Sequence, residues 1–216
     1  MSTTPTIADS ALGNLGGLLS DLETLYTDIH SHPELSMQER RTSEIAAKHL
    51  RDAGYDVTSG VGKTGVVGVL RNGDGPTVML RADMDALPVK EVTGLPYASA
   101  ATAVDATGKT VPVMHACGHD MHVAWLIGAA TLLAQARDSW HGTLIAVFQP
   151  GEETAEGARA MIEDGFFKRF PTPDVILGQH VMVGAAGVIG SRSGVVTSAG
   201  DSLQIQLFGR GAHGSM

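Results

Sequence analysis

The stretch that decides the fold is Gly142-Thr143-Leu144-Ile145-Ala146-Val147-Phe148, followed directly by Gln149-Pro150-Gly151-Glu152-Glu153. The first part is a nearly continuous apolar run, typical of a central β-strand buried on both faces. It favours an α/β protein. The strand delivers Glu152 and Glu153 to its carboxyl end. These carboxylates either form a solvated turn before a helix over 155–163 or have separate tasks, one on a metal and one on substrate or water, since adjacent side chains on extended backbone point different ways.

A second stretch, His115-Ala116-Cys117-Gly118-His119-Asp120-Met121-His122, holds the only cysteine of the chain and three of its nine histidines. Thiolate and imidazole groups at this density are typical of a metal site. On an extended segment Cys117 and His119 would share a side. An apolar helical run over 123–136 follows, so the cluster is predicted on a loop before a helix N-terminus, which favours a thiolate. The alternative is a buried cysteine beside capping histidines.

Two further stretches are predicted to end at the same edge of the sheet. A strand over 77–80 leads into Arg81-Ala82-Asp83-Met84-Asp85-Ala86-Leu87-Pro88, and a strand over 174–178 leads into Gln179-His180-Val181. The two aspartates are either metal ligands or groups that orient a ligating histidine, or they are turn residues. Open α/β sheets place their chemistry at the carboxyl ends of strands. Four stretches thus bring Asp, Cys, His and Glu to one edge, which predicts a metal site.

The N-terminal part of the chain reads as two helices followed by short strands. Leucines recur at helical spacing over 12–29, and the helix is expected to stop before Pro33. His30 and His32 at its exit are expected to be solvated. Ser36 and Glu39 have the spacing of a capping box that opens a second helix, which ends near residue 53.

Strands are predicted over 55–58 and 65–70, and the turn Asn72-Gly73-Asp74-Gly75 predicts a hairpin between the strands 65–70 and 77–80. Residues 89–114 are irregular, and a loop of this length inside a domain is expected to face substrate.

The pattern changes near residue 184. Strands with alternating polar positions are expected over 188–189, 194–196 and 203–208, which indicates a second domain with a half-exposed sheet. We therefore expect a metal-binding domain over 10–190 and the start of a second domain over 191–216, which the resemblance described below implies to be a lid or dimerisation domain. The sequence stops in a glycine-rich turn that carries His213, so we expect it to be a fragment.

Composition narrows the class of protein. The chain has 216 residues, 43% of them hydrophobic, and a formal net charge of −8, which argues against a nucleic-acid or anionic-membrane surface. Its apolar stretches are too short or too interrupted to span a bilayer, and we see no secretory signal. One cysteine cannot form an internal disulfide, which fits a reducing compartment. We expect a cytoplasmic protein.

Five motifs in order resemble the metal-dependent aminoacylase and carboxypeptidase superfamily, in particular the branch of hippurate hydrolases, N-acyl-amino-acid amidohydrolases and plant auxin-conjugate hydrolases. They are Arg81–Pro88, Met114–Asp120, Phe148–Glu153 with glycine where this branch more usually has alanine at 151, Gly178–Val181, and the terminal Gly-x-His213-Gly-Ser. The resemblance implies a mixed α/β sheet with helices on both faces, like the catalytic domain of zinc exopeptidases, followed by a smaller α+β domain.

The resemblance also implies roles for single residues. The residues that look like metal ligands are Cys117, His119, Glu153 and His180. They would bind one or two divalent ions, with Mn²⁺ or Zn²⁺ expected first and Co²⁺ or Ni²⁺ as alternatives. Glu152 resembles the general base for hydrolysis of an N-acyl amino acid, and Asp85 a group beside the ligands. His213 resembles a histidine that reaches the active site of a partner subunit, which implies a homodimer or higher oligomer. The last metal-binding histidine of the family would lie beyond residue 216.

Other functions remain open from the residues. A carboxypeptidase or dipeptidase would use the same metal site. A hydrolase with Cys117 as nucleophile and a nearby histidine as base would explain the lone cysteine and leave the glutamate pair unexplained. A metal-binding protein without catalysis would lack the base that Glu152 supplies.

Overall fold

The computed structural model describes residues 6–196, 200, 203–211 and 214. The chain divides into two units, Met1–Val181 and Met182–Met216. The first unit carries every helix and strand assigned in the described residues. His213 lies outside the described residues.

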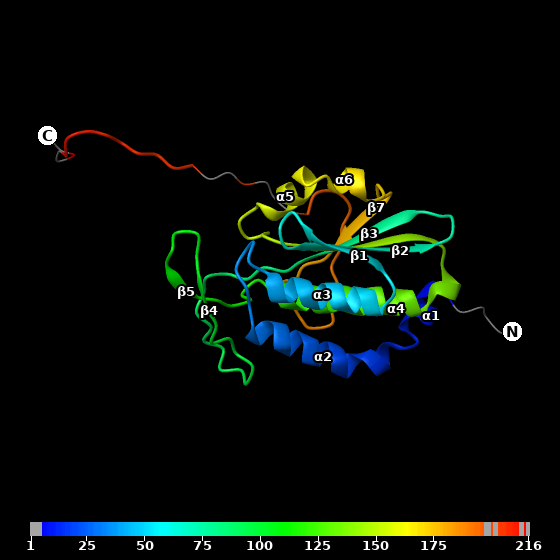
Figure 1. Cartoon of the computed structure of the whole chain (residues 1–216). Coiled ribbons are helices and arrows are strands. Elements are labelled where there is room, and N and C mark those ends of the chain that lie inside the picture. The colour runs from blue at the N-terminus through cyan, green and yellow to red at the C-terminus, as the bar shows by residue number, and fades with distance from the viewer. Residues whose placement is uncertain (1–5, 197–199, 201–202, 212–213, 215–216) are drawn as a thin grey trace. The chain divides into compact units, whose positions relative to one another are not determined.

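The first unit is built on a five-stranded mixed sheet with the order β1-β2-β6-β3-β7 (Figure 1). The strands are β1 (Asp56–Val61), β2 (Gly65–Asn72), β3 (Thr77–Asp83), β6 (Gly142–Gln149) and β7 (Val175–Gly178). β6 is the central strand, antiparallel to β2 and parallel to β3, and β3 is parallel to β7. Every residue of β6 from Leu144 to Phe148 is buried. The prediction of a central strand buried on both faces is confirmed.

Helices cover both faces of this sheet (Figure 1). On one face lie α2 (Leu15–Ser31), α3 (Arg40–Asp52) and α4 (His119–Gln135), with α1 (Ile7–Leu12) before them. On the other lie α5 (Gly157–Glu163) and α6 (Phe166–Arg169). One apolar core, including Ile29, Leu50 and Phe148, fills the first interface, and another, including Met161 and Phe166, fills the second. The α/β fold class with helices on both faces is confirmed.

The hairpin predicted between β2 and β3 is wrong. β6 lies between them: Asn72 pairs with Gly142 and Thr77 with Thr143. The turn over 72–75 reverses the chain, but a turn sequence does not choose the partner of a strand. β6 is buried on both faces and pairs along both of its edges, so it occupies the position between the two strands.

The capping box predicted for α3 is also wrong. Ser36 Oγ donates a hydrogen bond of 2.6 Å to Asp85 Oδ2 and does not cap the helix. The carboxylate of Glu34 accepts hydrogen bonds from the backbone N–H groups of Arg41 and Thr42, both at 2.9 Å. A carboxylate from the preceding loop thus satisfies these first N–H groups of the helix, and the side chain of Glu39 is left for other contacts.

His30 is buried, contrary to the expectation of a solvated residue, whereas the side chain of His32 is exposed. His30 Nδ1 lies 2.6 Å from Asp120 Oδ2, and Nε2 lies 3.1 Å from Glu91 Oε1. Burial alone would lower the pKa of His30, but hydrogen bonds to the two carboxylates outweigh it and raise the pKa. These contacts tie the 89–114 segment, which carries the short strands β4 (Thr102–Val104) and β5 (Thr110–Pro112), to α2.

The strands expected after residue 184 are not formed by the described residues 184–196 and 203–208. A strand needs a hydrogen-bonding partner, and this part of the chain pairs with no described segment. Within the described ranges, no helix has both the length and the apolar character needed to cross a membrane.

Candidate metal centre

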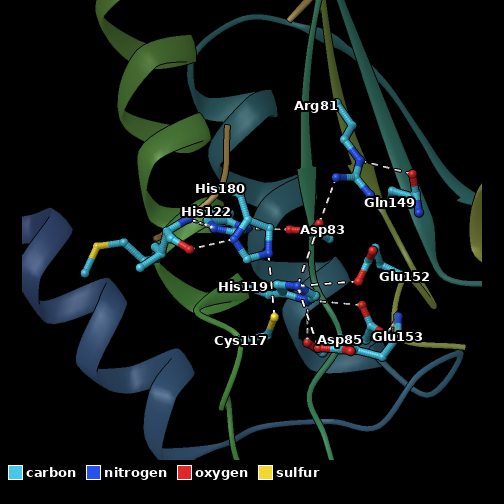
Figure 2. A network of polar contacts seen from close by, with 12 residues as sticks. Arg81, Asp83, Asp85, Cys117, His119, His122, Gln149, Glu152, Glu153 and His180 are labelled. Atoms are coloured by element: carbon cyan, nitrogen blue, oxygen red, sulfur yellow. Dashed lines mark hydrogen bonds and ion pairs between the residues drawn. The ribbon is translucent and has the colours of Figure 1, made fainter. Parts of the chain in front are cut away.

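The candidate site lies where three parallel strands end and α4 begins (Figure 2). β3 ends at Asp83, β6 at Gln149 and β7 at Gly178, and their shared direction brings the segments that follow to one edge of the sheet. The first residue of α4, His119, lies at this edge. The structure therefore brings together residues from all four stretches that sequence analysis assigned to one edge.

His119 is fully buried at the centre of the cluster. Its Nδ1 atom donates a hydrogen bond of 2.9 Å to the backbone carbonyl of Asp85, and the Oδ1 atom of that residue lies 3.3 Å away. With the proton held on Nδ1, the lone pair of Nε2 points into the site. This arrangement, in which one ring nitrogen is fixed by a neighbour and the other is free, is typical of metal-binding histidines.

Both glutamates of the pair face the free nitrogen of His119 (Figure 2). Glu152 Oε2 lies 3.7 Å and Glu153 Oε1 lies 3.9 Å from His119 Nε2. The expectation that the two side chains point different ways assumed extended backbone, whereas residues 152–155 form a turn. The turn is held by Asp85, whose Oδ2 atom accepts the backbone N–H of Glu153 at 3.0 Å.

Cys117 and His180 complete the cluster. Cys117 Sγ lies 3.6 Å from His180 Nε2, and His180 Nδ1 donates to the carbonyl of Val181 at 2.7 Å, so that the lone pair of Nε2 faces the sulfur. Potential ligand atoms of Cys117, His119 and His180 lie within 4.8 Å of one another, as do those of His119, Glu152 and Glu153. His119 belongs to both groups.

Asp83 also lines the site; it is one of the two aspartates that sequence analysis considered as metal ligands, orienting groups or turn residues. His122 lines the site too, although sequence analysis gave it no role of its own. His122 Nδ1 donates to Asp83 Oδ1 at 2.5 Å, and His122 Nε2 accepts the backbone N–H of Val181 at 2.9 Å. Both ring nitrogens are therefore engaged, and His122 holds the segment that carries His180. Its spacing of three residues from His119 at the start of a helix could have revealed a shared helix face.

One observation that does not depend on any sequence motif indicates that these residues suit a divalent metal ion. His119 Nε2 and Glu153 Oε1 are buried and have no hydrogen-bond partner among the described residues. Buried polar atoms without partners are costly, and a cation between them would satisfy both. A set of one thiol, two imidazoles and a carboxylate suits zinc and other transition metals.

The thiol of Cys117 lies among carboxylates, which disfavour its charged form. Burial raises its pKa to about 11, and the negative charges of Glu153, Glu152 and Asp83 act in the same direction. The carboxylates around the sulfur oppose the effect expected of the helix N-terminus, and the thiolate stays a prediction. This environment disfavours Cys117 as an independent nucleophile and suits a thiolate that forms with a bound cation.

Three comparisons with known proteins agree. The hippurate hydrolase of Campylobacter jejuni is 43% identical over 200 residues, which cover 92% of this chain and 49% of that protein. Thermostable carboxypeptidase 1 of Saccharolobus solfataricus is 43% identical over 192 residues, 87% of this chain and 46% of that protein. The chain thus spans about half the length of these curated relatives.

The structure is similar to that of the Bacillus subtilis YXEP protein, a dinuclear metal-binding peptidase of the M20 family. The TM-score is 0.67 at 38% identity, over 76% of this chain and 43% of that chain. Residues 79–211, which include the four stretches of the site, match the model of peptidase family M20/M25/M40. The chain therefore belongs to peptidase family M20/M25/M40.

Proposed function

We propose that this chain is the metal-binding part of a hydrolase that cleaves the amide bond of N-acyl amino acids. The observation that carries the proposal is that His119 Nε2 faces both Glu152 and Glu153, at 3.7 and 3.9 Å. The Glu152 side chain is 40% exposed and that of Glu153 only 18%. The more buried carboxylate suits a metal ligand, and the more exposed one suits a base that meets water and substrate.

In this proposal Cys117, His119, Glu153 and His180 hold one or two divalent ions. The bound metal supplies a lowered pKa for water and a polarised acyl carbonyl. Glu152 removes a proton from the attacking water and later donates it to the departing amine, so that one carboxylate serves first as base and then as acid. Asp85 fixes the tautomer of His119 and the backbone of Glu153.

The substrate class rests on the relatives and on the chemistry of the site. The hippurate hydrolase relative supports a benzoyl group on an amino acid, and we extend the proposal to acetyl and similar acyl groups. A carboxypeptidase or dipeptidase is the second candidate, and the Saccharolobus relative favours it with the same identity of 43%. Both reactions break an amide bond next to an amino-acid carboxylate with the same proposed metal site and base.

The test is Glu152→Gln in the full-length protein. Turnover is measured with hippurate and N-acetyl amino acids, and separately with dipeptides, which are substrates for the second candidate activity. We expect turnover to fall about 10²- to 10⁴-fold, the usual contribution of a general base, while metal content stays at the wild-type value. Thr154→Val is the matched control, because Thr154 lies in the same turn but bonds Glu156. Normal turnover in the Gln variant would remove Glu152 from its role, and loss of metal would make it a ligand.

Finer points belong to the same proposal. Mn²⁺ or Zn²⁺ is the expected metal. Co²⁺ and Ni²⁺ are kept as alternatives, because ligand type does not choose among these ions.

We propose a homodimer in which His213 reaches the substrate of a neighbouring subunit, and a lid or dimerisation domain that begins near residue 191. A single cysteine used as a ligand is suited to the cytoplasm, where thiols stay reduced.

A further inference from the structure

A buried carboxylate outside the proposed ligand set lies directly behind the glutamate pair. Glu39 has 0% exposure. In the part of the chain that the structure describes, no basic side chain forms an ion pair with it. Burying a carboxylate without a cation costs solvation free energy that must be offset by hydrogen bonds. What those bonds hold therefore indicates what Glu39 does.

Glu39 joins its own segment to two others that are distant in the sequence, at Thr64 and at Gly151. Its Oε1 atom accepts the backbone N–H groups of Met37 and Gly151, both at 2.8 Å. Its Oε2 atom accepts the hydroxyl of Thr64 at 2.5 Å. Glu39 does not cap α3, since Glu34 does so. Of the three bonds, the one to Gly151 reaches the segment that carries Glu152 and Glu153.

The backbone of Gly151 is tightly constrained. Its φ angle of +51° lies in the left-handed region, and a Cβ atom there would lie 2.6 Å from the sulfur of Met37. Its carbonyl accepts the N–H groups of Glu156 and Gly157, at 3.1 and 3.0 Å. The N–H of Gly151 is bonded to Glu39, so both backbone polar groups of this residue are fixed at the start of the turn that presents the two carboxylates.

We infer that Glu39 is a positioning residue, which sets the distance of Glu152 and Glu153 from His119 through its hydrogen bond to Gly151. The role depends on hydrogen-bond geometry and not on charge. A glutamine at this position can keep all three bonds, because its amide oxygen can accept both N–H groups and its NH₂ group can donate to the oxygen of Thr64. An aspartate keeps the charge but is one methylene shorter, so it cannot reach Gly151 and Thr64 together.

The test compares Glu39→Gln with Glu39→Asp in the full-length protein. Zn²⁺ affinity is measured by chelator competition, and kcat and KM are measured on an N-acyl amino acid that the wild type cleaves. For the Asp variant we expect about 10- to 100-fold weaker Zn²⁺ binding and a similar fall in kcat, as for other groups that orient ligands, with KM changed much less. The Gln variant should stay close to wild type in all three values.

Glu34→Asp is the matched control. It makes the same chemical change in a carboxylate that also accepts three hydrogen bonds, from Arg41 N–H and from the N–H and hydroxyl of Thr42. None of these side-chain hydrogen bonds reaches residues 149–153, so Glu34→Asp should lower the unfolding midpoint and leave Zn²⁺ affinity and kcat unchanged. If Glu39→Asp acted only through a general loss of stability, Glu34→Asp and Glu39→Asp would lower Zn²⁺ affinity and kcat alike. A positioning role predicts that only Glu39→Asp lowers them.

Two outcomes would overturn the inference: an Asp variant equal to wild type in Zn²⁺ affinity and kcat, or a Gln variant that loses both. The second outcome decides even if the Asp variant does not fold. The kinetic part rests on the proposed function, whereas Zn²⁺ affinity does not. A wild type that cleaves none of the substrates but keeps the order Gln above Asp in Zn²⁺ affinity would refute the proposed function and leave the role of Glu39 intact.

Discussion

Replacing Asp83 with asparagine tests how the site is built beneath its proposed ligands. Asp83 is the last residue of β3 and is 1% exposed. It accepts hydrogen bonds from His122 Nδ1 at 2.5 Å and from a guanidinium nitrogen of Arg81 at 2.8 Å. Burial alone would raise the pKa of Asp83, but the hydrogen bond from His122 and the charge of Arg81 lower it to about 2.

The magnitude follows from this pKa. A change from the ordinary 3.8 to about 2 corresponds to about 2.5 kcal/mol of stability, at roughly 1.4 kcal/mol for each pH unit. Because the pKa is lower in the folded protein, this stability is fully present above about pH 4. It is lost as the pH falls through about 2. Asp83→Asn should therefore cost roughly 2–3 kcal/mol at neutral pH and much less near pH 2.

The assay is urea unfolding of the wild type and the variant at several pH values between 7 and 2, in the presence of a chelator. Asp52→Asn is the control, since Asp52 is an exposed carboxylate paired with Lys48. We expect no resolvable change there, as is usual for surface ion pairs. A neutral-pH difference below about 0.5 kcal/mol, or a difference that does not shrink on acidification, would refute the assignment of Asp83 as a buried, charged anchor.

Two further predictions concern the same unit. His122→Phe keeps an aromatic ring but removes both hydrogen bonds of His122. Metal stoichiometry should be unchanged, while chelator competition should show about 10- to 100-fold weaker metal binding. Loss of a whole metal ion per chain would make His122 a ligand. Tyr55→Phe removes a hydrogen bond of 3.1 Å to the carbonyl of Ala130 in the core and should lower the free energy of unfolding by about 0.5–1.5 kcal/mol, measured in urea; an unchanged value would mean that this bond contributes nothing.

Much of the fold could be predicted because burial has a clear signature in sequence. The apolar run in β6 is central, and the strands that end at Asp83 and Gly178 run parallel to it. Parallel direction then brings their carboxyl ends together, which is why the four stretches meet. The partner of β2 could not be predicted, because the turn after it constrains only local backbone and β6 lies about 70 residues farther along.

The parts of the site that sequence analysis missed depend on contacts between distant segments. Ser36 has the spacing of a capping residue, but its hydroxyl lies against Asp85 and donates a hydrogen bond to it. Glu39 resembles an ordinary helix-start glutamate until Gly151 is placed beside it. His30 resembles a solvated helix end until Asp120 and Glu91 close around it. No local pattern distinguishes these buried groups from exposed residues of the same type.

The most direct test of the account is anomalous diffraction from crystals of the Zn²⁺-loaded full-length protein, recorded at the zinc absorption edge. We predict a peak about 2.0–2.3 Å from His119 Nε2 and from an oxygen of Glu153, with Cys117 Sγ or His180 Nε2 at similar distance. A peak ligated instead by Asp83 and His122, or no peak in crystals of loaded protein, would contradict the central claim that the strand ends of β3, β6 and β7 build a metal centre around His119.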